Sequence, residues 1–327
     1  FASQAYKAYF SDRSRGVIAS TTLAIKYQEE RKKSSLIYSG VYNNASGVNN
    51  TNQFIMAEKI TKDLNPRHGS IQKLHSREGD LITLCEDKVF KILANKDALY
   101  NADGNPQMIA TNRVLGQATP MGGEYGISKN PESFASQAYK AYFSDRSRGV
   151  ILKLDGQGLV PISDHGMKDY FADNLVNANN IIGSYDDKKD SYNVTLVGVG
   201  KTVSFGEKTN GWTSFKSFIQ EGGVSLNNNY YTFKNGNIWR HHQGVTAKFY
   251  GARIDPFVNV LFNQSPGSVK SFGSLNYEGS KAQVTQNIVD EEYNNNLASL
   301  GWYVSEGNTN LQQTDLLEFK NKEGKFF

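Results

Sequence analysis

The stretch NNYYTFKNGNIWRHH at residues 228–242 decides the fold class. Two runs rich in aromatic and β-branched side chains flank the dipeptide Asn235-Gly236. This dipeptide suits a two-residue type I′ loop, because both loop positions need a positive φ. The stretch therefore predicts a tight β-hairpin. The expected register has one cross-strand pair on each face: Phe233 with Ile238, and Thr232 with Trp239.

Four further segments carry the same pattern in weaker form. We expect strand pairs at residues 80–93, turning at Glu86-Asp87; at 148–163, turning at Asp155 to Gly158; at 191–205, turning at Gly198 to Gly200; and at 316–327, turning near Glu323-Gly324. Hairpins with little helix between them predict an all-β fold, mainly of antiparallel hairpins. Their centres are spaced too unevenly for a regular blade repeat, so a propeller-like domain and a multi-sheet domain both stay open.

Helical signals are few. Residues 167–175 could form one short helix, and Ser163-Asp164 just before them is a candidate N-terminal cap. We interpret the charged run EERKK at residues 29–33 as a solvated stretch, with the end of a short helix as the alternative.

Three regions are expected along the chain. They are an atypical N-terminal segment (residues 1–29), the first part of a β-rich domain (30–180) and its second part (181–327), which we expect to continue beyond residue 327. The N-terminal segment is atypical because residues 1–18, FASQAYKAYFSDRSRGVI, recur unchanged at residues 134–151, after which the identity stops at once. An evolved repeat decays gradually and spans a whole structural unit. We therefore interpret the first copy as an artefact or a very recent duplication, and the second as native strand.

The composition favours a folded protein without a nucleic-acid or membrane partner. Aromatic residues make up 12% of the 327 residues and the net charge is only +4, so the chain can bury enough apolar surface to fold. The charge is too small to indicate a nucleic-acid site. No apolar stretch approaches the roughly 18 residues of a membrane-spanning helix. Cys85, the only cysteine, lies in an apolar run and is expected to be an inert buried thiol.

Two kinds of motif resemble ligand-binding loops, and neither is complete. GVGKT at residues 198–202 lacks the first glycine of a phosphate-binding P-loop, since Thr195 occupies that position. The segment after it also reads as a strand, whereas a P-loop leads into a helix. The Asp-Gly turns at residues 101–105 and 155–158 lack the carboxylate series of a calcium loop. All three are predicted to be turns.

The five histidines do not indicate a metal site. His241 and His242 are adjacent, so in a strand they would point to opposite faces and could not readily share a metal ion. His68 and His75 have no obvious third ligand, and His165 lies apart from both pairs.

Acid pairs and tryptophans could together form a glycan site. The pairs Asp186-Asp187 and Glu291-Glu292 lie in polar runs and are expected to be solvated. The tryptophans could line a sugar, although packing in the core or a hairpin is the simpler use; they are Trp212, Trp239 and Trp302. The sequence therefore predicts no catalytic residue, no cofactor or cofactor-binding residue and no metal-ligating residue.

From about residue 30 onward the chain carries long and unusual strings. They are KKSSLIYSGVYN (32–43), NPRHGSIQKL (65–74), LCEDKVFKILANKDALYNADGNPQ (84–107), VLGQATPMGGEYGISKNPESFA (114–135), SRGVILKLDGQGLVPISDHGMKDYF (147–171), KTNGWTSFKSF (208–218), SLNNNYYTFKNGNIW (225–239) and SVKSFGSLNYEGS (268–280). Through these strings the chain resembles large virion structural proteins, of the tail or muzzle, of crAss-like tailed bacteriophages.

The resemblance implies a non-enzymatic component of the phage tail. Its implied partners are copies of itself in a symmetric ring and other tail proteins, and its implied location is the virion tail. A glycan-binding or glycan-hydrolysing β module of the same tail is the first alternative, and an unrelated bacterial surface β protein is the second. The residues without the resemblance predict only a β-rich domain in which no site is assembled.

Overall fold

The computed structural model describes residues 31–54, 59–100, 106–285, 298–322 and 325–326. The chain divides into two compact units, residues 1–256 and 257–327, which are described separately. The expectation for residues 1–29 lies outside the described residues. Of the charged run EERKK, residues 31–33 are described, and they are exposed and not helical.

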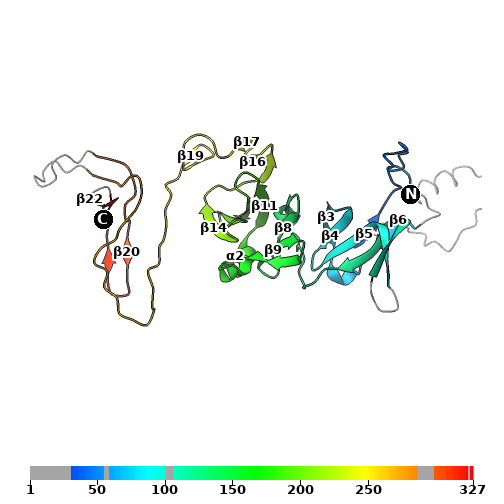
Figure 1. Ribbon diagram of the computed structural model, residues 1–327, viewed down its shortest axis with the longest axis horizontal. Coiled ribbons are helices and arrows are strands. Elements are labelled where there is room, and N and C mark those ends of the chain that lie inside the picture. Colours follow the sequence, from blue (N-terminus) through cyan, green and yellow to red (C-terminus); the bar gives the residue numbers. More distant parts are fainter. Residues whose placement is uncertain (1–30, 55–58, 101–105, 286–297, 323–324, 327) are drawn as a thin grey trace, which may run out of the picture. The chain divides into compact units, whose positions relative to one another are not determined.

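The first unit contains three antiparallel sheets of four strands, and in each sheet consecutive strands are neighbours (Figure 1). The strands of the first sheet are β3 (Ile71–Arg77), β4 (Asp80–Cys85), β5 (Val89–Tyr100) and β6 (Pro106–Pro120). Those of the second are β7 (Ala135–Gln137), β8 (Lys140–Asp145), β9 (Val150–Asp155) and β10 (Gly158–Pro161). Those of the third are β11 (Asn180–Asp186), β12 (Ser191–Val197), β13 (Lys201–Gly206) and β14 (Gly211–Lys216).

A fourth sheet of the same unit has only three strands, β15 (Gly222–Leu226), β16 (Asn229–Lys234) and β17 (Asn237–Arg240). Two short pairs accompany the sheets: β1 (Ser35–Ile37) with β2 (Thr61–Asp63), and β18 (Lys248–Phe249) with β19 (Ala252–Arg253). The helical elements are α2 (Lys168–Asn177) and the 3₁₀ turns η2 (Pro66–His68), η3 (Pro131–Ser133) and η4 (Ile162–Asp164).

Apolar clusters join neighbouring sheets. Leu84 of β4 and Phe143 of β8 belong to one buried cluster, which ties the first sheet to the second. Tyr142 of β8, Phe171 of α2 and Val194 of β12 belong to another, which ties the second sheet to the third. Strand β11 also contacts β7 on one side and β15 on the other. Both faces of β12, in the third sheet, are buried.

Alternation along β12 gives the third sheet one apolar and one polar face. Tyr192 and Val194 pack into the apolar cluster, whereas Asn193 and Thr195 point to the other face and are equally buried. Because buried polar groups need partners, that face is cross-linked by side chains. Thr195 bonds the hydroxyl of Thr202 at 2.7 Å, and Ser204 donates to Asn193 at 2.6 Å. This buried polar face supports the site described below.

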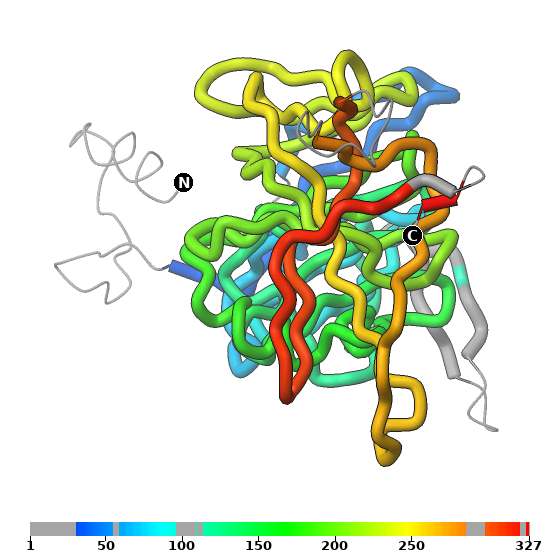
Figure 2. Tube along the Cα trace, turned by 90° about the vertical axis from the view of Figure 1, so that its left-hand side faces the viewer, coloured from blue at the N-terminus to red at the C-terminus, as the bar shows by residue number. Residues whose placement is uncertain are grey.

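The second unit consists of extended segments. Figures 1 and 2 show them running side by side. Its strands have two residues each and pair as hairpins: β20 (Gly307–Asn308) with β21 (Gln313–Thr314), and β22 (Asn321–Lys322) with β23 (Lys325–Phe326). Single bridges such as Ala282 with Trp302 connect the remaining segments. Among the described residues of this unit, Ala282 is the only buried hydrophobic one.

The predicted hairpins are confirmed. Phe233 pairs with Ile238 and Thr232 with Trp239, and Asn235 and Gly236 have φ values of 50° and 72°. Three other turns occur where they were expected, with cross-strand pairs at Leu84–Val89, Asp155–Gly158 and Leu196–Lys201. Lys322 pairs with Lys325, and the expected turn at Glu323-Gly324 between them lies outside the described residues. GVGKT is thus a hairpin turn that leads into β13. The all-β, multi-sheet class is confirmed.

The predicted short helix is present as α2, but its predicted cap is wrong. Ser163 and Asp164 lie in η4, and Met167 occupies the N-cap position without a side-chain hydrogen bond to the helix. Packing of Phe171 and Leu175 into the core stabilises this helix in place of a polar cap.

The second copy of the repeated string forms strands, as expected for a native segment. It runs through β7 and β8 into β9. The division between residues 180 and 181 stays a prediction. Ile151 and Val194, one on each side of it, lie in the same apolar cluster.

Candidate functional site

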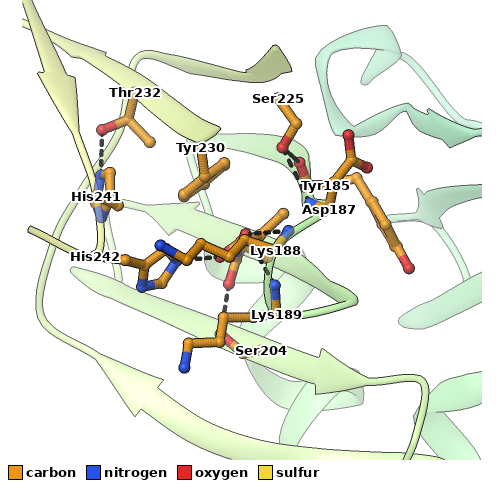
Figure 3. A network of polar contacts seen from close by, with 12 residues as sticks. Tyr185, Asp187, Lys188, Lys189, Ser204, Ser225, Tyr230, Thr232, His241 and His242 are labelled. Atoms are coloured by element: carbon orange, nitrogen blue, oxygen red, sulfur yellow. Dashed lines mark hydrogen bonds and ion pairs between the residues drawn. The ribbon is translucent and has the colours of Figure 1, made fainter. Parts of the chain in front are cut away.

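A buried carboxylate at the end of β11 is the centre of a polar cluster, and Figure 3 shows its partners Lys188, Lys189 and His242. Asp186 has no exposed surface. Its Oδ1 accepts hydrogen bonds from the backbone amides of Lys188 at 3.1 Å and Lys189 at 3.2 Å. Its Oδ2 accepts from Nε2 of His242 at 2.6 Å. The carboxylate therefore holds the β11–β12 turn and the chain after β17 together.

His241 lies beside this pair and faces the fourth sheet. Its Nε2 bonds the hydroxyl of Thr232 at 2.7 Å, and its ring centroid is 4.9 Å from that of Tyr230. Burial, followed by the neighbouring charges of His242 and Lys216, lowers the pKa of His241 to about 4. His241 is consequently neutral near pH 7.

A cavity of about 500 Å³ opens beside the two histidines. Three lysines line it, together with hydroxyl side chains of the third sheet. Lys216 is the most buried of the three, and its Nζ donates to Oδ1 of Asn193 at 2.9 Å. Burial lowers the pKa of Lys216, while the charge of Asp186 raises it in part. The cavity is thus lined by cations, by hydroxyls and by the aromatic residues Phe218 and Phe249, beside a single carboxylate that already accepts three hydrogen bonds.

The arrangement of the two histidines differs from the expectation. Their rings lie 6.3 Å apart, and both have centroids within 6.4 Å of Tyr230. The expectation of opposite faces is wrong because β17 ends at Arg240 and His242 adopts a left-handed backbone with a φ of 60°. Among the described residues, no group of three or more His, Cys, Asp or Glu side chains could hold a metal ion.

The other histidines take structural positions. His68 packs edge-on against Phe90, and the ring of His75 lies 5.1 Å from Phe134. Nδ1 of His165 bonds the carbonyl oxygen of Asn210 at 2.9 Å.

Of the two acid pairs, only Asp186-Asp187 lies in the described part of the chain, and its two members differ in burial. Asp187 is exposed as expected, but the prediction that Asp186 is solvated is wrong, because the fourth sheet and the chain after it cover this residue. Glu291 and Glu292 lie outside the described residues. Asp186 could not be identified as the centre of a cluster from the sequence, since its partner His242 is 56 residues away.

The tryptophans are distributed over different parts of the chain. Trp212 packs against Phe171 at 4.5 Å between ring centroids and donates its Nε1–H to the carbonyl of Ile162 at 3.0 Å. The ring of Trp239 packs at a tilt against that of Tyr250, with 5.4 Å between the centroids. Trp302, in the second unit, is 39% exposed. Two of the three therefore have packing roles within the first unit.

A second buried polar cluster joins the second and third sheets. Glu207 accepts a hydrogen bond from the hydroxyl of Tyr142 at 2.6 Å and forms ion pairs with Lys140 and Lys153. The ring of Tyr142 stacks on that of Tyr192 at 4.9 Å. Burial raises the pKa of Tyr142 far above its usual range, and the Glu207 carboxylate raises it further. The cluster is a structural link between the two sheets.

Cys85 is buried, as expected. Burial, with a smaller contribution from the charge of Glu86, raises the pKa of its thiol to about 11. No helix among the described residues is long and apolar enough to span a membrane.

Comparison with solved structures gives weak likenesses. A selenomethionine-substituted virginiamycin B lyase from Staphylococcus aureus is 7% identical with a TM-score of 0.30, over 57% of this chain and 60% of that chain. A catalytically inactive form of that lyase with quinupristin is 7% identical with a TM-score of 0.29, over 55% and 58%. A streptogramin B lyase is 9% identical with a TM-score of 0.28, over 57% and 58%. The chain spans less than two thirds of each, and these low scores carry no argument.

No curated protein matches the chain. A family model, by contrast, matches most of it. The family model described as crassvirus muzzle protein matches residues 19–236, which is more than half of the chain. The matched residues include the three four-stranded sheets and the strands β15 and β16 of the fourth sheet. The resemblance noted in the sequence is thereby confirmed, and the chain belongs to the crassvirus muzzle protein family, whose members are components of the virion tail.

Proposed function

We propose that this chain is a non-enzymatic building block of the phage tail muzzle, and that copies of it assemble into a symmetric ring. Family membership makes it a structural protein of the virion, and a virion protein contacts other virion proteins. The assembly into a ring and the absence of catalysis are proposals that go beyond family membership.

The exposed apolar surface of the second unit is the observation that carries the proposal. Soluble monomers rarely expose large contiguous apolar patches, and protein interfaces are enriched in aromatic side chains. Among the described residues of this unit, fourteen large hydrophobic ones are exposed: Phe257, Val258, Val260, Leu261, Phe262, Val269, Phe272, Leu275, Leu300, Trp302, Tyr303, Leu311, Leu316 and Leu317. Only one hydrophobic residue of the described part is buried, so a neighbouring subunit is the expected cover of this surface.

The stacking of sheets in the first unit supports a propeller-like arrangement as part of the same proposal. β11, the first strand of the third sheet, contacts the first strands of the second and fourth sheets, β7 and β15. Antiparallel sheets of four strands that stack with their first strands adjacent are typical of propeller blades.

The non-enzymatic part rests on the polar clusters. Asp186 and Glu207 are both occupied by donors from the chain itself. A pair of facing carboxylates, which a glycan-cleaving site needs, is not formed by Asp186 and its exposed neighbour Asp187.

The ring is tested with the full chain. Light scattering coupled to size-exclusion chromatography is expected to give a mass that is a multiple of 36.4 kDa, and electron microscopy is expected to give rotationally symmetric class averages. A monodisperse monomer at all concentrations, together with a position outside the tail in a virion reconstruction, would overturn the proposal. Hydrolysis of a host surface glycan by the pure protein would overturn its non-enzymatic part.

A further inference from the structure

The fourth sheet of the first unit lacks a strand that its neighbours have. The three preceding sheets contain four strands each, whereas the fourth contains β15, β16 and β17. Because β15 lies against β11, the missing position is beside β17.

The free edge of β17 is ready to accept a strand. Asn237 and Trp239 face β16 as hydrogen-bonded partners of Lys234 and Thr232, which leaves the backbone groups of Ile238 and Arg240 directed outward. Among the described residues, no backbone hydrogen bond reaches these outward groups. An unpaired edge of this kind is a template for a further strand.

One face of the same sheet is apolar and uncovered. Ile238 is 67% exposed, and it lies across from Phe233 on the face that Val224 and Leu226 share. The opposite face is buried: Tyr230 bonds Ser184 of the third sheet, and Thr232 bonds His241. A fourth strand with apolar side chains at alternate positions would extend the uncovered apolar face.

Residues 257–262, FVNVLF, have the composition of such a strand. Five of the six residues are apolar and the sixth is Asn259; none is charged and none is proline. Such segments have high β propensity. Their five apolar side chains are 57–87% exposed, and the segment forms no strand in the described chain. Val258, Val260 and Phe262 would share one face of a strand, next to Ile238.

Residues 257–262 belong to the second unit and β17 to the first. The charges of the two units favour association between copies. Residues 257–327 contain eight acidic and five basic residues and have a net charge of −3. Because the net charge of the whole chain is +4, residues 1–256 have a net charge of +7. Opposite net charges favour the encounter of one copy's second unit with another copy's first unit.

We propose that residues 257–262 of one copy add to β17 of a second copy as the fourth, antiparallel strand of its β15–β17 sheet. This inference rests on the proposed ring, since it requires neighbouring copies. Main-chain hydrogen bonds to Ile238 and Arg240 provide the affinity, and the apolar side chains cover the exposed face. The antiparallel direction follows the pairing of every sheet in the first unit.

Cysteine cross-linking between differently tagged copies tests this strand addition. One full-length copy carries Ile238→Cys and the other Val260→Cys, and the two are mixed and treated with a short bis-maleimide. The native Cys85 is buried, with a thiol pKa of about 11, so it does not compete. We expect a cross-linked product that contains both tags.

A matched pair of proline variants supplies the control. Added to the copy that carries Val260→Cys, Val258→Pro removes a backbone donor of the added strand, and Val269→Pro makes the same change at another exposed valine of the second unit. Val258→Pro is expected to lower the yield of the mixed product by roughly tenfold or more, which corresponds to about 1.4 kcal/mol. Val269→Pro is expected to leave the yield unchanged.

The outcomes separate the inference from the proposed ring. A ring that forms without the mixed product, or a mixed product whose yield is unchanged by Val258→Pro, overturns the strand addition and leaves the ring. Cross-linking only within one chain that carries both cysteines overturns it in favour of pairing inside a single copy. A chain that stays monomeric overturns both.

Discussion

His242 and Asp186 form a buried hydrogen bond of 2.6 Å between residues 56 positions apart. Asp186 ends β11 and has no exposed surface, while the side chain of His242 is 22% exposed. The contact links the third sheet to the chain that follows the fourth sheet. Its strength determines how firmly β15–β17, and with it the proposed docking edge, is held.

The first prediction concerns Asp186. Asp186→Asn removes the negative charge and keeps the size, so the bonds from His242 and from two backbone amides weaken. We expect a loss of about 2 kcal/mol in the free energy of unfolding, because hydrogen bonds to charged groups contribute about 1.5–3 kcal/mol. Asp187→Asn is the matched control at an exposed site and is expected to change stability by less than about 0.5 kcal/mol. Urea unfolding measures both, and equal effects would contradict the structural role of Asp186.

The second prediction concerns pH. Folding lowers the pKa of His241 from 6.5 to about 4, so between these values the unfolded chain binds a proton that the folded chain does not. Stability is therefore unaffected by His241 above pH 6.5 and decreases as the pH falls towards 4. After a discount for solvent screening, the expected loss at pH 4 is about 1–2 kcal/mol.

His241→Gln tests this pH dependence, since glutamine does not titrate and can still bond Thr232. The melting temperature of this variant is expected to fall less between pH 7.5 and pH 5 than that of the unchanged chain. Parallel pH profiles for the two proteins would show that another group is responsible.

The third prediction concerns Glu207, whose side chain is 8% exposed. Glu207→Gln leaves Lys140 and Lys153 without their shared carboxylate and weakens the bond from Tyr142. We expect a destabilisation of about 1–2 kcal/mol from the weakened bonds of Tyr142 and Lys140, because Lys153 keeps its ion pair with Asp155 and Lys140 is 34% exposed. Glu78→Gln, at a side chain that is 69% exposed, is expected to be nearly neutral. Thermal unfolding compares them, and a neutral Glu207→Gln would argue against the link between the second and third sheets.

The fourth prediction concerns the loop between the first two sheets. A Cβ at Gly126 would lie 2.1 Å from the carbonyl oxygen of Glu86, and the amide of Gly126 donates to the buried Asp145 at 3.1 Å. Gly126→Ala must displace this backbone, and we expect a loss of about 2–3 kcal/mol. At Gly122 nothing lies within 4 Å of an added Cβ, so Gly122→Ala is the control and is expected to fold normally. Similar melting temperatures for the two variants would contradict the close approach.

The hairpins were predictable because their determinants are local. Asn235-Gly236 and the turns at Gly198 to Gly200 and Asp155 to Gly158 depend on which residues tolerate a positive φ and on neighbouring strand propensity. The cap of α2 was predicted wrongly for the opposite reason. Ser163 has the right chemistry, but the packing of Phe171 decides where the helix begins.

The candidate site was not predictable, because it is built from residues distant in the sequence. Asp186 reads as one acid in the solvated run DDKKD, and only the fourth sheet and the chain after it bury this residue. Lys216 likewise reads as a surface lysine at the end of a strand. Its contact with Asn193 depends on the pairing of β12, β13 and β14 in one sheet.

The sequence by itself determined the strands, their turns and the family, since turn chemistry and long family strings are properties of contiguous residues. Only the tertiary structure decided which polar groups are buried, that His241 and His242 lie on the same side, and that the fourth sheet stops at three strands. Burial and strand number depend on contacts between segments that are tens of residues apart, and no local pattern encodes such contacts.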